Sequence, residues 1–475
     1  MTPTTSGTTR RPFGMRDKIG YMFGDFGNDF TFILQSAFFM LFYTNVVGIN
    51  PGHVGLLLLT ARVLDGFTDV GMGILVDRLP VKAGGAKFKR WIKFIAIPVA
   101  VASALMYMAF VADFDSYTAK LVWMCATYML WGSVCYTAVN IPYGSMASVV
   151  SDNPDHRAEL SVFRSTGATL AQLIIMGALP LLVYTTNEAG VSVLSGPRMS
   201  IAAAVCAVLA VGCYALCYRL VEERVPSGSG KDGTSPGIAT MLRAVFTNRA
   251  LLGLIVAAML LLLSMLFLGQ MVSYLFLNYF GDGKLSSPAS IAGIAPALLL
   301  IVLAPMLSRR FGKAETGMVA MFGAGALFVL AFFIKIQNPV WWIVVYAVGM
   351  FAISVFNYLV WAFITDVIDF QEVRSGSRDD GTVYAIYSWA RKLGQALAGG
   401  LTGWSLGLIG FDAQAAKQGM AQTPEVNEGI YMLANLVPGV GCLLVGAALL
   451  LLYPLKKSVV EENTRTLRER RAAKA

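Results

Sequence analysis

The chain of 475 residues is 56% hydrophobic and only 14% charged, with a mean hydropathy of +0.64. A soluble protein carries roughly a quarter charged residues, so this composition excludes an ordinary soluble domain. The net charge of +9 would suit a nucleic-acid partner, but the basic residues flank apolar stretches on one side, as the positive-inside rule predicts for membrane proteins. We therefore expect no nucleic-acid partner.

Apolar stretches long enough to cross a bilayer recur along the whole chain. We predict twelve membrane spans, near residues 19–47, 52–76, 92–112, 119–147, 160–184, 198–220, 248–279, 289–309, 315–336, 339–369, 383–410 and 427–454. The basic residues then place both termini in the cytoplasm. The expected protein is an all-α polytopic protein of the cell (plasma or inner) membrane, in contact with membrane lipid.

The first predicted span contains the sequence GYMFGDFGNDFTF, residues 20–32. Asp25 and Asp29 are four residues apart and share a helix face, and Asn28 stands beside Asp29. Asp25 is nearer the cytoplasmic end, where a solvated carboxylate or a structural cap is expected. Asp29 lies deeper, and we expect it to accept hydrogen bonds from a sugar, or to pair with Arg62 or Arg164.

The second predicted span contains ARVLDGFTDVGMG, residues 61–73. Helical spacing puts Arg62, Asp65 and Asp69 on one face, with the Thr68 hydroxyl close to it. Ionisable groups at this depth usually mark ion or substrate pathways. One arginine neutralises only one carboxylate, so the other needs a cation or a proton, and a structural arginine–aspartate pair is the alternative. We predict a cation site here, with Na⁺ as a candidate ligand of Asp65 and Asp69.

The fourth predicted span contains YTAVNIPYG, residues 136–144. Tyr136, Thr137 and Asn140 precede Pro142, which frees a backbone carbonyl that needs another partner. The Asn140 amide both donates and accepts hydrogen bonds, which suits a polyhydroxylated ligand or an ion. A structural hydrogen bond between helices is the alternative.

The longest polar break, residues 219–249, contains the linker-like sequence PSGSGKDGTSPG. It separates six spans from six, which predicts an N-terminal six-helix bundle (1–218), a cytoplasmic linker (219–249), a C-terminal six-helix bundle (250–454) and a cytoplasmic tail (455–475) that is a short charged helix or arm. Such an arrangement favours a substrate site between the bundles near the bilayer midplane. The linker is no phosphate-binding loop, because Val225 stands where that motif needs its first glycine.

Charged residues gather again around spans 10 and 11, in WAFITDVIDFQEV (361–373) and YAIYSWARKLGQ (384–395). Opposed charges near two helix ends suit a gate that closes in one conformation, and ordinary flanking charge is the alternative. The predicted gating network consists of Arg62, Asp366, Asp369, Arg378 and Arg391. Lys392 lies deepest in span 11 and is expected to reach a central cavity.

No constellation for catalysis or for a bound cofactor is present in the sequence. The two histidines lie near loops, and the six cysteines have no metal-site or redox spacing. We therefore expect neither an enzyme nor a cofactor.

The motifs GDFGNDF, ARVLDGFTDVGMGILVDR, KFKRW, NIPYGSM and DVIDFQE resemble those of the glycoside–pentoside–hexuronide:cation symporters, the melibiose permease-like family of the major facilitator superfamily. The resemblance covers essentially the whole chain. It implies a twelve-helix secondary transporter that imports a glycoside, pentoside or hexuronide with Na⁺ or H⁺, or with Li⁺, by alternating access.

The resemblance also assigns roles to individual positions. The implied cation site comprises Asp65, Thr68, Asp69 and Thr137, with Asn140 where the family has a third carboxylate. The implied sugar-binding residues are Asp29, Tyr136, Arg164 and Lys392, to which we add Asn28 and Asn140.

This chain departs from melibiose permease, the best-known member of the family, which has a lysine in place of Asn28 and an aspartate in place of Asn140. The two pocket tryptophans of that member fall at Gly144 and Asn357. The sugar pocket is therefore expected to differ, the coupling cation stays open, and a uronic acid or a sulfonated sugar is compatible with the sequence.

Two other functions remain compatible with the sequence, a cation-coupled lysolipid or lipid carrier of the same fold and a non-transporting membrane receptor or scaffold. The polar intramembrane residues favour a hydrophilic substrate over a lipid. We expect a monomer, and a regulatory phosphotransfer protein is a candidate partner.

Overall fold

The computed structural model of the protein describes residues 11–78, 86–151, 153–225, 248–375 and 380–472. Contacts within the chain define two compact units. Within the described residues, the first unit draws on the ranges Met1–Phe39, Leu64–Ile175 and Gly196–Asp232, and the second on Met40–Val63, Met176–Ser195 and Gly233–Ala475. The bundle boundaries predicted from the sequence stay a prediction, and most of the predicted linker, residues 226–247, lies outside the described residues.

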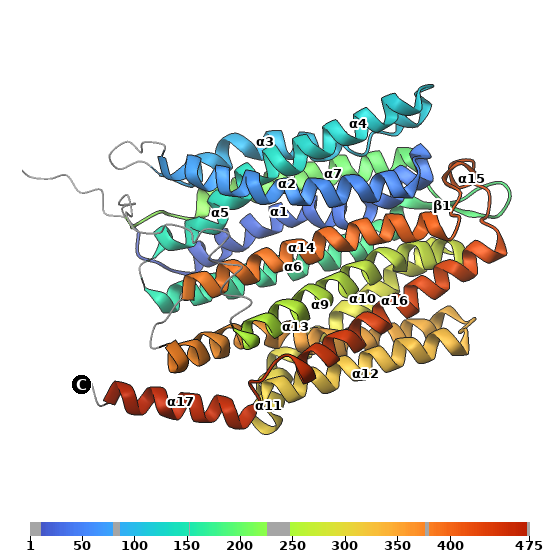
Figure 1. The fold of residues 1–475 in the computed structure, drawn as a ribbon. Helices are drawn as coiled ribbons and strands as arrows, with labels where there is room; N and C mark the ends of the chain where they lie inside the picture. The colour runs from blue at the N-terminus through green and yellow to red at the C-terminus, as the bar shows by residue number, and fades with distance from the viewer. Residues whose placement is uncertain (1–10, 79–85, 152, 226–247, 376–379, 473–475) are drawn as a thin grey trace, which may run out of the picture. The chain divides into compact units, whose positions relative to one another are not determined.

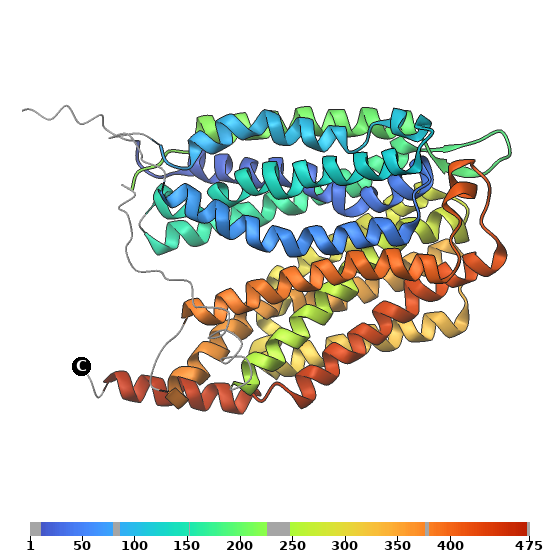
Figure 2. The same cartoon turned by 45° about the horizontal axis from the view of Figure 1, so that its top comes forward.

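The first half of the chain is almost entirely helical. Its elements are α1 (Met15–Phe42) with the π-helical turn η1 (Tyr43–Val47), α2 (Pro51–Arg78), α3 (Lys89–Leu105) with the 3₁₀ turn η2 (Ala109–Asp113), α4 (Tyr117–Met129), the π-helical segment η3 (Leu130–Tyr136), α5 (Thr137–Val150), α6 (Pro154–Val183) and α7 (Gly196–Leu220). Within the first unit, α3 packs against α7 and α5, and these long helices run side by side (Figures 1 and 2). Residues between α6 and α7 form an antiparallel hairpin, β1 (Tyr184–Thr186) and β2 (Ser192–Leu194), which the sequence analysis did not predict.

The second half repeats this helical organisation. Its elements are α9 (Arg249–Tyr274) with η4 (Leu275–Tyr279), η5 (Gly283–Leu285), α10 (Ser286–Ile294), η6 (Ala295–Leu299), α11 (Leu300–Phe311), α12 (Lys313–Ile334), α13 (Pro339–Ser375), α14 (Asp380–Leu408), α15 (Ala413–Lys417), α16 (Pro424–Leu451) and α17 (Lys457–Ala472). Helix α16 packs against α12 and α9, and α14 packs against α9. The charged tail is the helix α17, which packs against α13.

Each of the twelve predicted spans falls on helical segments of the structure. Within the described residues, nine helices are long and apolar enough to cross a membrane. Helix α2, which carries Arg62, Asp65 and Asp69, and helix α14 are not among them, and the eighth span is divided into α10, η6 and α11. The chain is a multi-pass, all-α membrane protein, as predicted.

Two glycines allow α1 to lie close to its neighbours in the first unit. A Cβ atom at Gly167 of α6 would lie 2.6 Å from the carbonyl oxygen of Met22, and one at Gly24 would collide with the ring of Tyr143 on α5. Small residues permit such close approach of helix backbones. This packing brings the polar residues of α1 within reach of α5 and α6.

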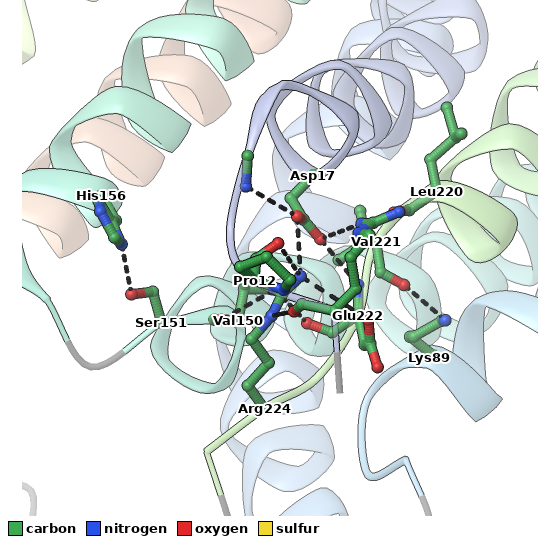
Figure 3. A network of polar contacts seen from close by, with 12 residues as sticks. Pro12, Asp17, Lys89, Val150, Ser151, His156, Leu220, Val221, Glu222 and Arg224 are labelled. Carbon is green, nitrogen blue, oxygen red and sulfur yellow. Dashed lines mark hydrogen bonds and ion pairs between the residues drawn. The ribbon is translucent and has the colours of Figure 1, made fainter. Parts of the chain in front are cut away.

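A network of polar contacts surrounds the start of α1 (Figure 3). The Asp17 carboxylate, which is 0% exposed, accepts hydrogen bonds from the guanidinium groups of Arg11 and Arg224, each at 2.9 Å. It also accepts from the backbone N–H groups of Gly14 (3.2 Å) and Glu222 (3.1 Å). Full hydrogen bonding of this kind is what makes a buried charge tolerable.

The same network fastens the chain that leaves α7. The Arg224 guanidinium also donates to the carbonyl oxygens of Arg11 (2.6 Å) and Val150 (3.3 Å). The Glu223 carboxylate accepts from the backbone N–H groups of residues 87, 88 and 89 at 2.6–2.9 Å. A carboxylate is favoured at the N-terminus of a helix, so residues 222–225 are held against the beginnings of both α1 and α3.

We predict that Asp17→Asn markedly lowers the stability of the protein. The substitution removes the negative charge that Arg11 and Arg224 share, and breaking a buried pair in this way typically costs about 3–5 kcal/mol. The midpoint of thermal unfolding in detergent should therefore fall by several degrees.

The matched control is Glu159→Gln, which removes an ion pair between Lys18 and Glu159 on the same side of the first unit. Glu159 is 48% exposed in that pair, and exposed pairs contribute at most about 1 kcal/mol. Equal shifts for the two variants would contradict the assignment of Asp17 as a buried anchor.

Candidate functional site

Two acidic residues of α2 pair with two hydroxyl groups of the fourth span. Ser133 donates a hydrogen bond to Asp65 Oδ1 (2.7 Å), and Thr137 donates one to Asp69 Oδ1 (2.8 Å). Asp65, Ser133 and Thr137 are all buried. The two acids are four residues apart, and so are the two hydroxyls. The two hydrogen bonds therefore lie about one helical turn apart between the same two spans.

The backbone of the fourth span is unusual at this point. Residues 130–136 form the π-helical segment η3 between α4 and α5. The Thr137 hydroxyl lies 3.2 Å from the carbonyl oxygen of Gly132, five residues earlier, as well as beside Asp69. Short π-helical insertions are frequent at functional sites, and this one carries Ser133 and leads directly into Thr137.

The contacts sort the predicted cation-site residues into two groups. Asp65, Asp69 and Thr137 take part in the two hydrogen bonds between the spans. The Thr68 hydroxyl instead donates to the carbonyl oxygen of Asp65 in its own helix (3.2 Å). The Asn140 side chain accepts a hydrogen bond from Asn28 on α1 (3.4 Å). Arg62, on the same helix as the two acids, is half-buried.

Ser133 is absent from the cation site predicted from the sequence. It stands four residues before Thr137, a spacing that places both hydroxyls on one helix face and was the available signal for including it.

The ion-pair partner of Arg164 is Asp25 and not Asp29. The Arg164 Nε atom donates to Asp25 Oδ1 at 2.9 Å, and Asp25 is buried, so the expectation of a solvated carboxylate was wrong. The Arg164 guanidinium also lies over the ring of Tyr143, 5.4 Å from its centroid. The Tyr143 hydroxyl in turn donates to the backbone carbonyl of Tyr21 (2.7 Å).

Asp29 has a different environment from Asp25. It is half-buried, and among the described residues its carboxylate has no hydrogen-bond or ion-pair partner. Its neighbour Asn28 accepts a hydrogen bond from the Tyr214 hydroxyl (2.7 Å) and donates one to Asn140. Asp29 therefore offers open acceptor sites beside a fixed polar network, which is an arrangement suited to ligand hydroxyl groups.

Tyr136, another predicted sugar-binding residue, stacks on Phe32 with a centroid distance of 5.7 Å.

The predicted gating residues of the second unit have partners that the sequence analysis did not identify. Asp366 of α13 accepts from the Lys313 ammonium of α12 at 2.6 Å. Arg391 of α14 lies over the rings of Trp361 (5.3 Å) and Tyr387 (5.8 Å) and donates to the Tyr387 hydroxyl (3.1 Å).

Two further predicted residues of the second unit are Asp369, from the gating network, and Lys392, from the sugar-binding set. Asp369 and Lys392 are half-buried. Arg378 lies outside the described residues.

The sequence matches known membrane transporters along nearly its whole length. The model of a family described as MFS/sugar transport protein matches residues 20–457. The chain is 29% identical to the glucuronide carrier protein homolog of Escherichia coli K12, over 95% of this chain and 96% of that protein. It is 31% identical to the putative glycoside/cation symporter YagG of the same organism, over 97% and 96% of the two chains.

A solved structure supports the fold. The nucleoside transporter NupG superposes with a TM-score of 0.63, covering 93% of this chain and 100% of that one at 13% sequence identity. At this identity the likeness concerns the fold alone.

The different environments of the two acids on α1 lead to a prediction. Asp25→Asn should lower the midpoint of thermal unfolding, because it leaves the Arg164 guanidinium without its carboxylate. Asp29→Asn, four residues away on the same helix, should leave that midpoint nearly unchanged. Thermal unfolding of both variants in detergent tests this, and a larger loss for Asp29→Asn would contradict the assigned pairing.

Proposed function

The chain belongs to the MFS/sugar transport protein family, and from this premise we propose that it carries a sugar across the membrane together with a coupling cation, by alternating access. It is a membrane transporter and not an enzyme. The resemblance to glycoside–pentoside–hexuronide:cation symporters predicted from its motifs is thereby confirmed.

The observation that carries the proposal is the pairing of two intramembrane carboxylates with two hydroxyls. Asp65 and Asp69 carry two negative charges on one helix, on which Arg62 carries one positive charge, and ionisable groups at this depth usually mark ion or substrate pathways. Hard cations prefer carboxylate and hydroxyl oxygens as ligands. The hydrogen bonds of Asp65 and Asp69 with Ser133 and Thr137 therefore support a site for Na⁺ or Li⁺. Protonation of one carboxylate is the alternative form of coupling.

Cation and sugar binding are linked through α5. Thr137 contacts Asp69 of the cation site, and Asn140, less than one helical turn later, contacts Asn28 beside Asp29. A cation that draws Asp69 and Thr137 into one arrangement also affects the position of Asn140. Linkage requires that the sugar then favours cation binding to the same degree.

For the substrate we propose a neutral glycoside or pentoside. In the first unit the charge of Arg164 is already neutralised by Asp25, and Asp29 adds a carboxylate with open acceptor sites. Sugar hydroxyls match these acceptors, with Asn28, Asn140 and Tyr136 alongside. A hexuronide is the second candidate, favoured by the likeness to a glucuronide carrier protein homolog and by the cationic Lys392.

We further propose an inner-membrane location with both termini in the cytoplasm, because the basic residues flank the spans on that side. The protein works as a monomer built of the two six-helix bundles predicted from the sequence, and a phosphotransfer protein is a candidate regulator. The ion pair between Lys313 and Asp366 belongs to the gate of the second bundle.

We predict that Asp65→Asn and Asp69→Asn each abolish cation-stimulated sugar uptake. Each substitution removes one negative charge from the cation site, so the cation no longer gains enough Coulomb energy to drive accumulation. The test is uptake of a panel of neutral and acidic sugars into proteoliposomes under separate Na⁺, Li⁺ and proton gradients. Asp115→Asn, an exposed acid in the loop before α4, is the control and should behave as wild type. Undiminished accumulation by both variants would refute the cation site.

We predict a different defect for Asp29→Asn. A hydrogen bond to a charged group contributes about 1.5–3 kcal/mol, so KM for the transported sugar should rise roughly 10- to 100-fold. The cation concentration needed for half-maximal stimulation should stay nearly the same. A change in cation requirement without a change in KM would instead assign Asp29 to the cation site.

A further inference from the structure

We propose that Ser133 is a positioning and specificity residue of the cation site, which orients Asp65 and supplies an additional hydroxyl oxygen ligand to a bound alkali-metal cation. This inference rests on the proposed cation-coupled transport. It goes beyond the residues that the family resemblance implies, since those place no ligand at this position.

The Ser133 hydroxyl points to another helix and not to its own backbone. Serine and threonine hydroxyls inside helices commonly donate back to a carbonyl of their own helix. Thr127, Ser264 and Thr402 do so in this protein, each bonding the carbonyl oxygen four residues earlier at 2.8–2.9 Å. Ser133 instead donates across to Asp65 on another helix at 2.7 Å, with only a distant contact to the Met129 sulfur (3.8 Å) in its own helix.

The backbone supports this unusual direction. Ser133 lies inside the π-helical segment η3, in which the carbonyl groups do not stand where an α-helix would place them. Thr137, the first residue after this segment, donates to the carbonyl oxygen of Gly132, five residues earlier. The insertion therefore aims both hydroxyls at α2 together.

Asp65 and Ser133 are both buried, with a glycine beside them. Asp65 is 8% exposed and Ser133 is 7% exposed, and a buried carboxylate needs hydrogen-bond donors or a cation. The neighbouring Gly132 has no side chain, and a Cβ atom there would lie 4.0 Å from Asp65 Oδ1. Gly132 therefore places no side chain of its own beside the Asp65 carboxylate, to which the adjacent Ser133 donates its hydrogen bond.

The chemistry of the hydroxyl makes it suitable for an exchange of roles. A serine hydroxyl has one proton and two lone pairs. Without a cation, the proton is donated to Asp65, as the structure shows. With a cation bound, the Asp65 carboxylate contacts the cation directly, and the hydroxyl turns so that a lone pair of its oxygen faces the same ion. Asn140 replaces a carboxylate of the family's site, and Ser133 provides an additional oxygen.

The test is the cation dependence of sugar uptake into proteoliposomes by Ser133→Ala, measured against Na⁺ and Li⁺ in turn. Loss of a ligand to a charged group should raise the half-maximal Na⁺ concentration about tenfold or more and should change the ratio of the Na⁺ and Li⁺ requirements. KM for the sugar at saturating cation should stay within about twofold of wild type, since the sugar-binding residues are unchanged.

Two further variants separate a ligand role from a structural one. Ser133→Thr keeps the hydroxyl and should retain the wild-type Na⁺ requirement. Ser264→Ala removes an equally buried hydroxyl that bonds only within its own helix and should also behave as wild type. If Ser133→Ala does not reach the membrane, Ser133→Cys replaces it, because a thiol keeps the volume without a hard oxygen ligand.

Each outcome decides the proposal. An unchanged Na⁺ requirement in Ser133→Ala or Ser133→Cys overturns the role of Ser133. A rise in the sugar KM at saturating cation, with the Na⁺ requirement unchanged, overturns it as well. Wild-type uptake driven by protons alone overturns the ligand role as well but leaves sugar symport intact. Wild-type uptake that no cation gradient stimulates overturns the proposed coupling itself.

Discussion

The structure depends on one constraint, which is that charged groups within an apolar bundle must be matched by partners on other helices. Hydrocarbon provides no hydrogen bonds, so an unpaired polar group there is costly. The protein meets this constraint with hydroxyls for Asp65 and Asp69, with Arg164 for Asp25, and with an ammonium group for Asp366. Each match fixes how two helices of one unit lie against each other.

The degree of matching separates structural residues from functional ones. Asp17 receives four hydrogen bonds and holds the start of α1 to the chain beyond α7. Asp29 receives none from the described residues, although it is on the same helix. A carboxylate without donors has acceptor sites for a ligand, so the absence of a hydrogen-bond partner among the described residues, more than burial alone, is what sets Asp29 apart.

Helix α5 contacts residues of both the proposed cation site and the proposed sugar site. Its first residue, Thr137, contacts Asp69, and Asn140 contacts Asn28 on α1. The π-helical segment that precedes it sets the direction of Thr137 and of Ser133 before it. Coupling between a cation and a sugar requires a shared element whose position both ligands affect, and a helix with polar contacts to both sites has this property.

The sequence by itself determined the membrane spans, the helix faces and the family, because hydropathy and helical spacing depend only on neighbouring residues. It was sufficient to identify Asp65 and Asp69 as an acidic pair. Only the tertiary structure decided which groups meet across helices, and it paired Arg164 with Asp25 and Ser133 with Asp65. Those choices depend on how one helix is rotated and shifted against another, and on a π-helical insertion, neither of which a local pattern encodes.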